Sequence, residues 1–394
     1  FKARAKIQRL FKQAQISKIE TESPIKNINL DYTDDELNNF TKGQLKNILS
    51  LYDDKIGTLQ NKLKLVEQTR DDLLSQIGNN LHPSVIISND EKNNAVVKEW
   101  GNKRSDKCKS HYELLPLIGL NTQKGSHVSG SRGYFLTGKI AQLQLGLISY
   151  ATQFLTSKGY ELIIPPYFMN ANVMSKVAQL SQYDDELYRV SEGDKDNHKY
   201  LIATSEQPIA SYHQNEILSA ENLPIKYAGY STCWRREVGS HGKDTAGIFR
   251  VHQFDKVEQF CITTPNDSHD MLLKMLSISE EFYQSLEIPY RIVGIVSGAL
   301  NNSCSIKYDI ECYFPSNDTY RELVSCSNCT DYQSKNMNIK YKKDNNVEYV
   351  HMLNSTLCAL TRTICVIAET YQTDNGIKIP KVLQPYIGCD FIKF

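Results

Sequence analysis

The chain of 394 residues is long enough for two or three domains with a sizeable core. Lysine plus arginine balance aspartate plus glutamate at 45 each, so a nucleic-acid-binding surface would have to come from local segregation of charge. No apolar run reaches the roughly eighteen residues of a membrane span, and ten scattered cysteines without a secretory signal predict reduced thiols. The sequence starts at Phe1 and not at methionine, so we expect it to begin inside a longer gene product, which leaves a targeting segment open.

Residues 1–80 predict an antiparallel two-helix coiled coil. One helix is expected over 2–19, and Pro24 with the Asn- and Asp-rich residues after it separates this helix from the next. In the second helix an apolar or aromatic residue recurs at every seventh position, which is typical of a coiled coil. The repeating positions are Leu45, Tyr52, Leu59, Val66 and Leu73, with Ile56, Leu63 and Ile77 on the interleaved series.

The first of these helices is strongly basic. Residues 1–18 contain no acidic residue. Such a helix is most often a solvated face, but it can also contact a phosphate backbone without sequence preference. The residues that would make this contact are Lys2, Arg4, Lys6, Arg9 and Lys12.

Polar residues 81–107 predict a connector to one large domain over 108–394. Within that domain, residues 138–158 predict an amphipathic helix because apolar side chains recur at spacings of three and four. A strand is expected from Gly159 to the prolines at 165 and 166. Taken alone, this would be an ordinary helix–strand unit.

Thr204 and Glu206 follow a β-type segment that begins at Tyr200. Two residues apart on a strand, their side chains would share a face and could bind an amine together with a small polar group. As a short pattern this is weak evidence, and the start of a helix is the ordinary alternative.

Two β-type segments, 230–236 and 249–260, predict antiparallel strands joined by a long glycine-containing loop. Loops of this length are usually functional or disordered. Arg235 and Arg250 on neighbouring strands could hold phosphate oxygens through paired hydrogen bonds, and Phe254 offers an aromatic face to a base. The alternative is a hairpin with a solvated charged face.

The remaining chain predicts a helix over 267–286, strands from Tyr308 and Tyr320, and a strand that runs into a helix over 350–365. Cys326 and Cys329 form a CxxC pair inside this region. A structural zinc site needs about four ligands, and because the sequence has no second such pair we do not predict zinc.

Residues 231–260 resemble motif 2 of the class II aminoacyl-tRNA synthetases, in particular that of the seryl-tRNA synthetases. The order Arg-x-Glu, glycine-rich loop and Arg-Val-His-Gln-Phe is kept, with Trp234 in place of the usual phenylalanine. The helix and strand over 138–166 are similar to motif 1, which builds the dimer interface in that class. The segment 350–365 is similar to motif 3, so the resemblance extends over nearly the whole chain.

The resemblance implies an α+β fold, in which a mixed antiparallel sheet flanked by helices follows the coiled-coil arm. It implies an enzyme that activates L-serine with ATP and Mg²⁺ and esterifies tRNA(Ser), with tRNA(Sec) left open. It also implies a cytosolic homodimer that does not cross a membrane. A non-catalytic tRNA-binding relative and a coiled-coil interaction protein remain alternatives.

The same resemblance assigns roles to individual residues. Catalysis is assigned to Arg235, Glu237, Arg250 and Arg362, and magnesium to Glu322 and Ser325. Serine binding is assigned to Thr204, Ser205, Glu206, Arg235, Glu258, Asn354 and Thr356. ATP binding is assigned to Arg235, Arg236, Glu237, Val251, His252, Gln253, Phe254, Glu322, Leu323, Val324, Ser325 and Arg362.

Overall fold

The computed structural model describes residues 2–13, 25, 29, 32–74, 76–177, 186–191, 198–238 and 246–394. It divides the chain into two compact units, Phe1–Ile77 and Gly78–Phe394. Within the described residues, no helix is both long enough and apolar enough to cross a bilayer.

The N-terminal unit contains α1 (Lys2–Gln13), α2 (Asp34–Asn38) and the long helix α3 (Lys42–Leu74). Both predicted helices are therefore confirmed, although α1 ends at Gln13 and residues 14–24 lie outside the described part of the chain. Ile7 of α1 and Leu37 of α2 pack on the first turns of α3 in a small core with Leu45, Ile48 and Tyr52. An ion pair between Arg4 and Asp53 also joins α1 to α3.

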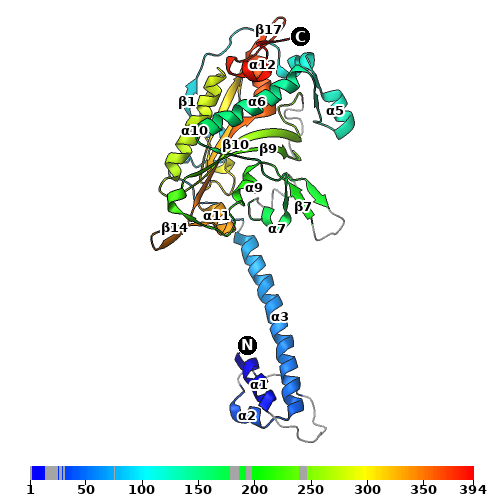
Figure 1. Ribbon diagram of the computed structural model, residues 1–394, viewed down its shortest axis with the longest axis vertical. Helices are drawn as coiled ribbons and strands as arrows, with labels where there is room; N and C mark the ends of the chain where they lie inside the picture. Colours follow the sequence, from blue (N-terminus) through cyan, green and yellow to red (C-terminus); the bar gives the residue numbers. More distant parts are fainter. Residues whose placement is uncertain are drawn as a thin grey trace. The chain divides into compact units, whose positions relative to one another are not determined.

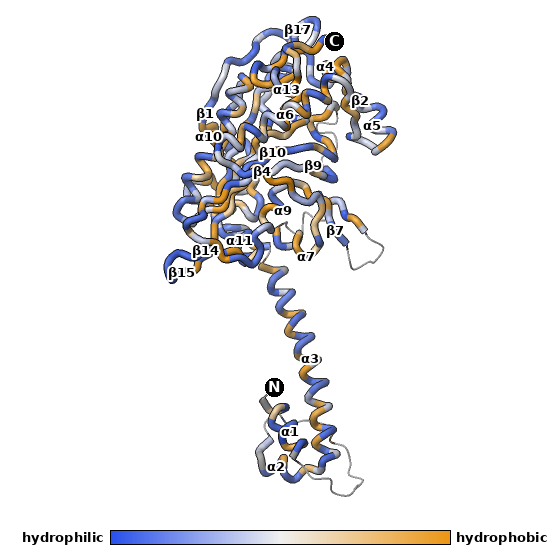
Figure 2. Tube along the Cα trace, in the orientation of Figure 1, coloured by the Kyte–Doolittle hydropathy of each residue, from blue (hydrophilic) through white to orange (hydrophobic). Residues whose placement is uncertain are grey.

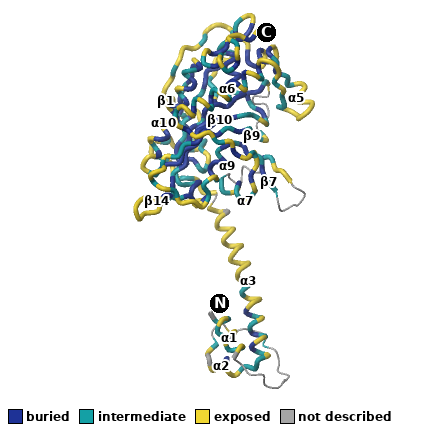
Figure 3. Tube along the Cα trace, in the orientation of Figure 1, coloured by how far each residue is buried: buried dark blue, intermediate teal, exposed yellow. Residues whose placement is uncertain are grey.

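The second half of α3 is exposed. Of the heptad positions that follow Tyr52, Ile56 is partly buried, but the later ones, Leu59, Leu63, Val66, Leu73 and Ile77, have more than half of their surface accessible. Figure 3 shows the change from a partly buried to an exposed helix along α3. Figure 2 shows apolar residues recurring among hydrophilic ones along this stretch. Coiled-coil pairing beyond Tyr52 stays a prediction, because the described residues of the first helix end at Gln13.

The C-terminal unit is built on an eight-stranded sheet with the order β1-β11-β12-β13-β16-β10-β9-β4. All neighbours are antiparallel except β4 and β9, which run parallel. Figure 1 shows β9 and β10 near the middle of this unit. The strands are β1 (Ala95–Trp100), β4 (Glu161–Ile163), β9 (Ile225–Trp234), β10 (Gln253–Thr263), β11 (Tyr290–Gly294), β12 (Ile306–Phe314), β13 (Thr319–Asn328) and β16 (His351–Ala359).

Three amphipathic helices cover the sheet: α6 (Lys139–Ser157), α10 (Ser268–Ser285) and α12 (Leu360–Thr370). Their apolar stripes point inward because side chains three and four residues apart share one helix face. In α6 the buried stripe is Ile140, Leu143, Leu147, Ala151 and Leu155. The predicted helices over 138–158 and 267–286 and the strand-to-helix segment over 350–365 are all confirmed.

Smaller sheets surround the main one. Their strands are β2 (Leu120–Asn121) and β3 (Phe135–Leu136); β5 (Phe168–Asn170), β6 (Arg189–Ser191) and β7 (His198–Leu201); β8 (Ile217–Ser219), β14 (Lys340–Lys343) and β15 (Asn346–Tyr349); and β17 (Gln372–Thr373), β18 (Gly376–Lys378) and β19 (Phe391–Lys393). The segment 81–107 is more than a connector, because its β1 pairs with β11 and completes one edge of the main sheet.

Candidate active site

The predicted hairpin is the paired strands β9 and β10, in which Trp234 lies opposite Gln253. The pairing is confirmed, but β10 begins at Gln253 and not at Phe249, so Arg235 and Arg250 lie just beyond the strands. The backbone N–H of Arg235 donates to the carbonyl of His252 at 2.8 Å and closes the hairpin. Residues 239–245 of the connecting loop lie outside the described residues.

Glu258 of β10 is the centre of a buried polar cluster. Its Oε2 accepts hydrogen bonds from the hydroxyls of Thr204 at 2.6 Å and Ser205 at 2.5 Å, and from the backbone N–H of Glu206 at 3.2 Å. Its Oε1 lies 2.5 Å from the Nζ of Lys256. Burial opposes the charge of Glu258, but the ammonium of Lys256 and the hydroxyl donors outweigh it and hold the pKa of Glu258 below its ordinary value.

The approach of Ser205 to Glu258 depends on a glycine. Gly229 of β9 lies opposite Glu258, and a Cβ at this position would come within 2.8 Å of the Ser205 hydroxyl oxygen. Because glycine leaves that space free, Ser205 can lie over the sheet and donate to the carboxylate.

The spacing suggested that Thr204 and Glu206 lie on one strand, but Glu206 does not continue a strand. It begins the short helix α9 (Glu206–Ala210), so the alternative of a helix start is correct. Its Oε1 accepts a hydrogen bond from the Nε2 of Gln333 at 2.7 Å. Burial, with the neighbouring charge of Glu258, raises the pKa of Glu206 to about 7, so two adjacent carboxylates have very different pKa values.

A cavity of about 280 Å³ opens next to this cluster. Thr204, Glu206 and Glu258 line it together with Asn354 and Thr356 of β16. Thr356 lies opposite Glu258 in the β10–β16 pairing, which places the two side chains on one face of the sheet. Arg235 lines the cavity as well, so the structure brings together predicted serine-binding residues from four separate parts of the sequence.

A second cavity, of about 50 Å³, lies on the same sheet face toward the loop end of the hairpin. Its charged side chains pair with one another: Glu237 with Arg250 at 2.7 Å, and Arg362 with the Glu322 carboxylate at 3.7 Å. Arg362 also donates to the backbone carbonyl of Glu322 at 2.8 Å. The guanidinium of Arg235 lies over the ring of Phe254, 5.4 Å from its centroid. Most residues predicted to bind ATP thus gather around one site.

Glu322 and Ser325 of β13 both line the serine-side cavity, and Glu322 also lines the smaller one. Desolvation in the cavity opposes the charge of Glu322, but Arg362 and Lys307 lower its pKa, so the carboxylate stays ionised at neutral pH. Carboxylate and hydroxyl oxygens are hard ligands that suit Mg²⁺ when phosphates and water complete the shell. The donor set therefore fits the predicted ion.

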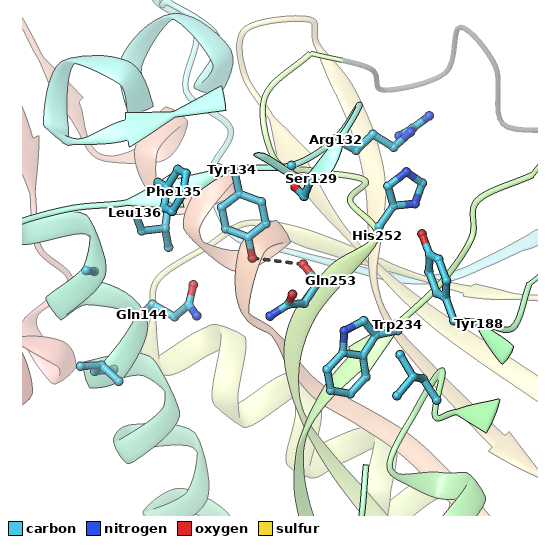
Figure 4. A pocket seen from close by; sticks show the side chains of 14 residues that line it. Ser129, Arg132, Tyr134, Phe135, Leu136, Gln144, Tyr188, Trp234, His252 and Gln253 are labelled. Atoms are coloured by element: carbon cyan, nitrogen blue, oxygen red, sulfur yellow. Dashed lines mark hydrogen bonds between the residues drawn. The ribbon is translucent and has the colours of Figure 1, made fainter. Parts of the chain in front are cut away.

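Five of the predicted ATP residues do not line the smaller cavity: Arg236, His252, Gln253, Val324 and Ser325, the last of which lines the serine-side cavity. His252 and Gln253 line a separate cavity of about 640 Å³. Gln253 faces the side of the sheet opposite to that of its neighbour Phe254, because side chains alternate along a strand, and His252 precedes the strand. Figure 4 shows both there with Trp234, and the hydroxyl of Tyr134 donates to the carbonyl of Gln253 at 3.1 Å. Val324 is fully buried, whereas Val251 and Leu323 line the smaller cavity. Arg236 donates its backbone N–H to Glu186 at 2.9 Å.

Two further charged residues were missed in the sequence. Lys256 lies two residues before Glu258, and this spacing on one strand could have revealed that they share a face. Asp309 of β12 lies opposite Ser325, and burial together with the charge of Glu322 raises its pKa to about 7. No local pattern pointed to Asp309, since its neighbours come from another strand.

The cysteines and the basic helix remain to be placed. Cys326 and Cys329 are free and buried, and Asn354 donates to the sulfur of Cys329 at 3.7 Å. In α1, Arg4 and Lys6 bond within the N-terminal unit, to Asp53 and to the carbonyl of Tyr32. Arg9 and Lys12 are exposed, and the side chain of Lys2 lies outside the described part of the structure.

Residues 188–371 match the family described as tRNA synthetase class II core domain (G, H, P, S and T). The sheet and the site therefore belong to a class II tRNA synthetase. The cytoplasmic serine–tRNA ligase of Arabidopsis thaliana is 53% identical over 334 residues, which cover 82% of this chain and 73% of the relative. The chain belongs to the seryl-tRNA synthetase family.

Solved structures agree. The cytoplasmic serine–tRNA ligase of Naegleria fowleri in complex with AMP is similar with a TM-score of 0.81 and 51% identity, covering 86% of this chain and 82% of that one. The seryl-tRNA synthetase of Pyrococcus horikoshii complexed with ATP has the same TM-score at 38% identity, covering 89% and 83%. The predicted α+β class II fold is therefore confirmed.

Proposed function

We propose that the protein activates L-serine with ATP to seryl-adenylate, releases pyrophosphate, and transfers the seryl group to the 3′ end of tRNA(Ser) with release of AMP. The observation that carries this proposal is the buried Glu258 cluster beside the arginine-lined cavity. An amino-acid ammonium and a nucleotide phosphate would meet there on one sheet face. The cytoplasm is the proposed location, in keeping with the names of the relatives.

Serine would be recognised by hydrogen bonds. Glu258 and Thr204 would take the ammonium and hydroxyl, and Asn354 and Thr356 would close the pocket around the side chain. A site built to bond a hydroxyl rejects analogues that lack it, because its buried polar groups would then be unpaired. Threonine, which carries one more methyl group, would have to be rejected by lack of space.

ATP would replace contacts that the side chains make with one another. Arg250 and Arg362 would leave Glu237 and the Glu322 carbonyl for the outer phosphate, and Phe254 would stack on adenine. Glu322 and Ser325 would hold Mg²⁺, which neutralises phosphate charge when bound. Arg235 lies at the junction of the two cavities and would stabilise charge on the α-phosphate while it orients the serine carboxylate.

The rest of the chain would serve tRNA and assembly. The exposed Arg9 and Lys12 of the N-terminal unit support contact with tRNA phosphates; whether tRNA(Sec) is also bound is a separate proposal. The exposed Leu145 on α6, with Leu162 and Ile164 at β4, supports a homodimer through motif 1.

The test is ATP–pyrophosphate exchange with each of the twenty amino acids in the absence of tRNA. We expect exchange driven by serine alone. Exchange driven by another amino acid would keep the class and overturn the serine pocket. Folded protein that shows no exchange but still binds tRNA would favour a non-catalytic tRNA-binding relative.

Glu258→Gln keeps the size of the side chain and removes its charge. We expect it to lower the serine kcat/KM by about a hundredfold, since hydrogen bonds to a buried charge contribute about 3 kcal/mol. Glu348→Gln, on the exposed strand β15, is the matched control and should leave exchange unchanged. Wild-type exchange by Glu258→Gln would refute the assignment of Glu258.

A further inference from the structure

Lys256 is a buried lysine in the middle of the site. Its side chain is 7% exposed, and its Nζ lies 2.5 Å from Glu258 Oε1 and 2.9 Å from Thr204 Oγ1. Lysine is rarely buried unless its ammonium is paired, so these two contacts define its position. They are also the two groups that would take the ammonium and hydroxyl of serine.

Lys256 belongs to both halves of the site. It lines the smaller cavity with Arg235 and Phe254, and it lines the larger cavity with Thr204 and Glu258. Phe254, Lys256 and Glu258 are two residues apart along β10, so their side chains share one face of the sheet. Lys256 therefore lies between the proposed adenine and serine positions.

Two ammonium groups compete for one carboxylate oxygen here. Glu258 Oε2 already accepts three hydrogen bonds, and Oε1 is the oxygen that Lys256 contacts. A second cation within hydrogen-bond distance of Oε1 would repel the first in this poorly hydrated place. Lysine has a flexible four-carbon stem, so its ammonium can move while its backbone stays in the strand.

We infer that Lys256 is an exchangeable counter-ion: its ammonium holds the serine-ammonium position on Glu258 and Thr204, and serine displaces it toward the nucleotide cavity. This inference rests on the proposed function, because it takes Glu258 as the serine ligand. Glu322, which lines both cavities, provides a negative charge on the nucleotide side.

The displaced ammonium adds positive charge where the ATP phosphates bind. Serine therefore strengthens ATP binding, and by thermodynamic reciprocity ATP strengthens serine binding by the same factor. Lys256 is a positioning residue in this scheme and takes no part in bond making. It couples the two substrates without any change in the backbone.

The first test uses the wild-type protein. A crystal structure with serine is expected to show the serine ammonium on Glu258, with the Lys256 Nζ more than about 3.5 Å from that carboxylate, beyond hydrogen-bond distance. A Lys256 Nζ that keeps its contact with Glu258 while serine is bound would overturn the inference.

The second test measures the serine Kd by calorimetry with and without α,β-methylene-ATP and Mg²⁺. In the wild type we expect the analogue to tighten serine binding at least about fivefold, and in Lys256→Met the ratio should fall to near one. A purely structural role would weaken serine binding in both conditions and leave the ratio unchanged. An unchanged ratio in Lys256→Met, or no coupling in the wild type, would overturn the inference.

Lys226→Met is the matched control, because Lys226 lies on the neighbouring strand β9 outside both cavities and donates to the backbone carbonyl of Lys158 at 3.1 Å. It should retain at least half of the wild-type ratio; equal loss in both variants would overturn a role specific to Lys256. Serine-driven pyrophosphate exchange separates the two proposals. If exchange depends on serine but Lys256→Met keeps its coupling, only the counter-ion inference fails.

Discussion

At the scale of single residues, the site works by giving neighbouring carboxylates different charges. Glu258 has a lysine and two hydroxyls around it and stays ionised. Glu206 has lost water and faces the charge of Glu258, so its pKa rises to about 7. A pocket with one full and one partial negative charge suits a single ammonium group, because two full charges would leave one of them uncompensated.

This difference predicts a pH-dependent effect of Glu206→Gln. A carboxyl whose pKa is raised in the folded state favours folding when protonated, so the wild type loses stability as pH rises from about 4.5 to 7. The glutamine side chain of the variant cannot ionise, so from pH 5 to pH 8 the free energy of unfolding of the variant should rise by about 1 kcal/mol relative to that of the wild type. This figure is reduced for solvent screening, because Glu206 is partly exposed to the cavity. Urea unfolding at both pH values measures it.

Glu348→Gln serves again as the control, because it removes an exposed carboxylate outside the site. Its stability difference from the wild type should be the same at pH 5 and pH 8. A Glu206→Gln effect that does not change between these pH values would contradict a pKa near 7.

At the scale of elements, the helix that carries Arg362 is anchored by a buried carboxylate. Glu369 of α12 accepts hydrogen bonds from the backbone N–H and the Nδ1 of His111, at 2.9 and 2.7 Å, and from the backbone N–H of Ser316 at 3.1 Å. Burial opposes its charge, but these donors hold the pKa of Glu369 below its ordinary value. The anchor fixes α12 against α4 (His111–Leu114) and the turn after β12.

We expect Glu369→Gln to lower the free energy of unfolding by about 3 kcal/mol at pH 7, since the variant weakens or loses the hydrogen bonds that buried donors make to the charged carboxylate. Because the folded pKa is depressed, the contribution of Glu369 is complete above about pH 4.5 and is lost as pH falls further. Unfolding curves at pH 7 and pH 4 test this. A deficit that is equal at both pH values would show that shape, and not charge, explains the effect.

The elements also show which parts of the fold can be predicted from the sequence. Alternation and turn residues predicted the β9–β10 hairpin, and a period of three to four predicted α6 and α10, because these signals are local. The strand ends in the structure differ from the predicted ones, because Arg235 and Arg250 look like strand residues but lie beyond the last residue pair of the β9–β10 ladder. The edge strand β1 was missed, because its pairing with β11 depends on chain nearly two hundred residues away.

The site was predictable to the extent that it follows motifs. Resemblance assigned Glu258, Thr204 and Thr356, and the structure brings them together. Lys256 was not predicted as a site residue, because a lysine on a strand normally extends to solvent and only the fold shows that its ammonium is buried. His252 and Gln253 belong to a motif run, yet both line the cavity of Figure 4: the pleat of the sheet accounts for Gln253, and His252 lies in the loop just before the strand.

At the scale of the whole molecule, the chain has two separate units, and we propose that chemistry belongs to one and tRNA capture to the other. The catalytic unit, Gly78–Phe394, has its own continuous core and contains every residue of both substrate cavities. The N-terminal unit has a separate small core and exposed basic residues on α1. Removal of the N-terminal unit should therefore leave serine activation intact while it weakens the capture of tRNA.

We expect deletion of residues 1–77 to change serine-dependent pyrophosphate exchange by less than about twofold and to lower kcat/KM for tRNA(Ser) charging by at least tenfold, about 1.4 kcal/mol.

Double replacement Arg9→Gln and Lys12→Gln tests the charges within the full chain. It should weaken charging most at low salt and reduce the slope of log Kd against log salt by up to about two, roughly one for each phosphate contact. If the truncated protein charges tRNA(Ser) like the wild type, the arm has no part in tRNA binding. If only the salt slope stays unchanged, the arm binds tRNA through other residues than Arg9 and Lys12.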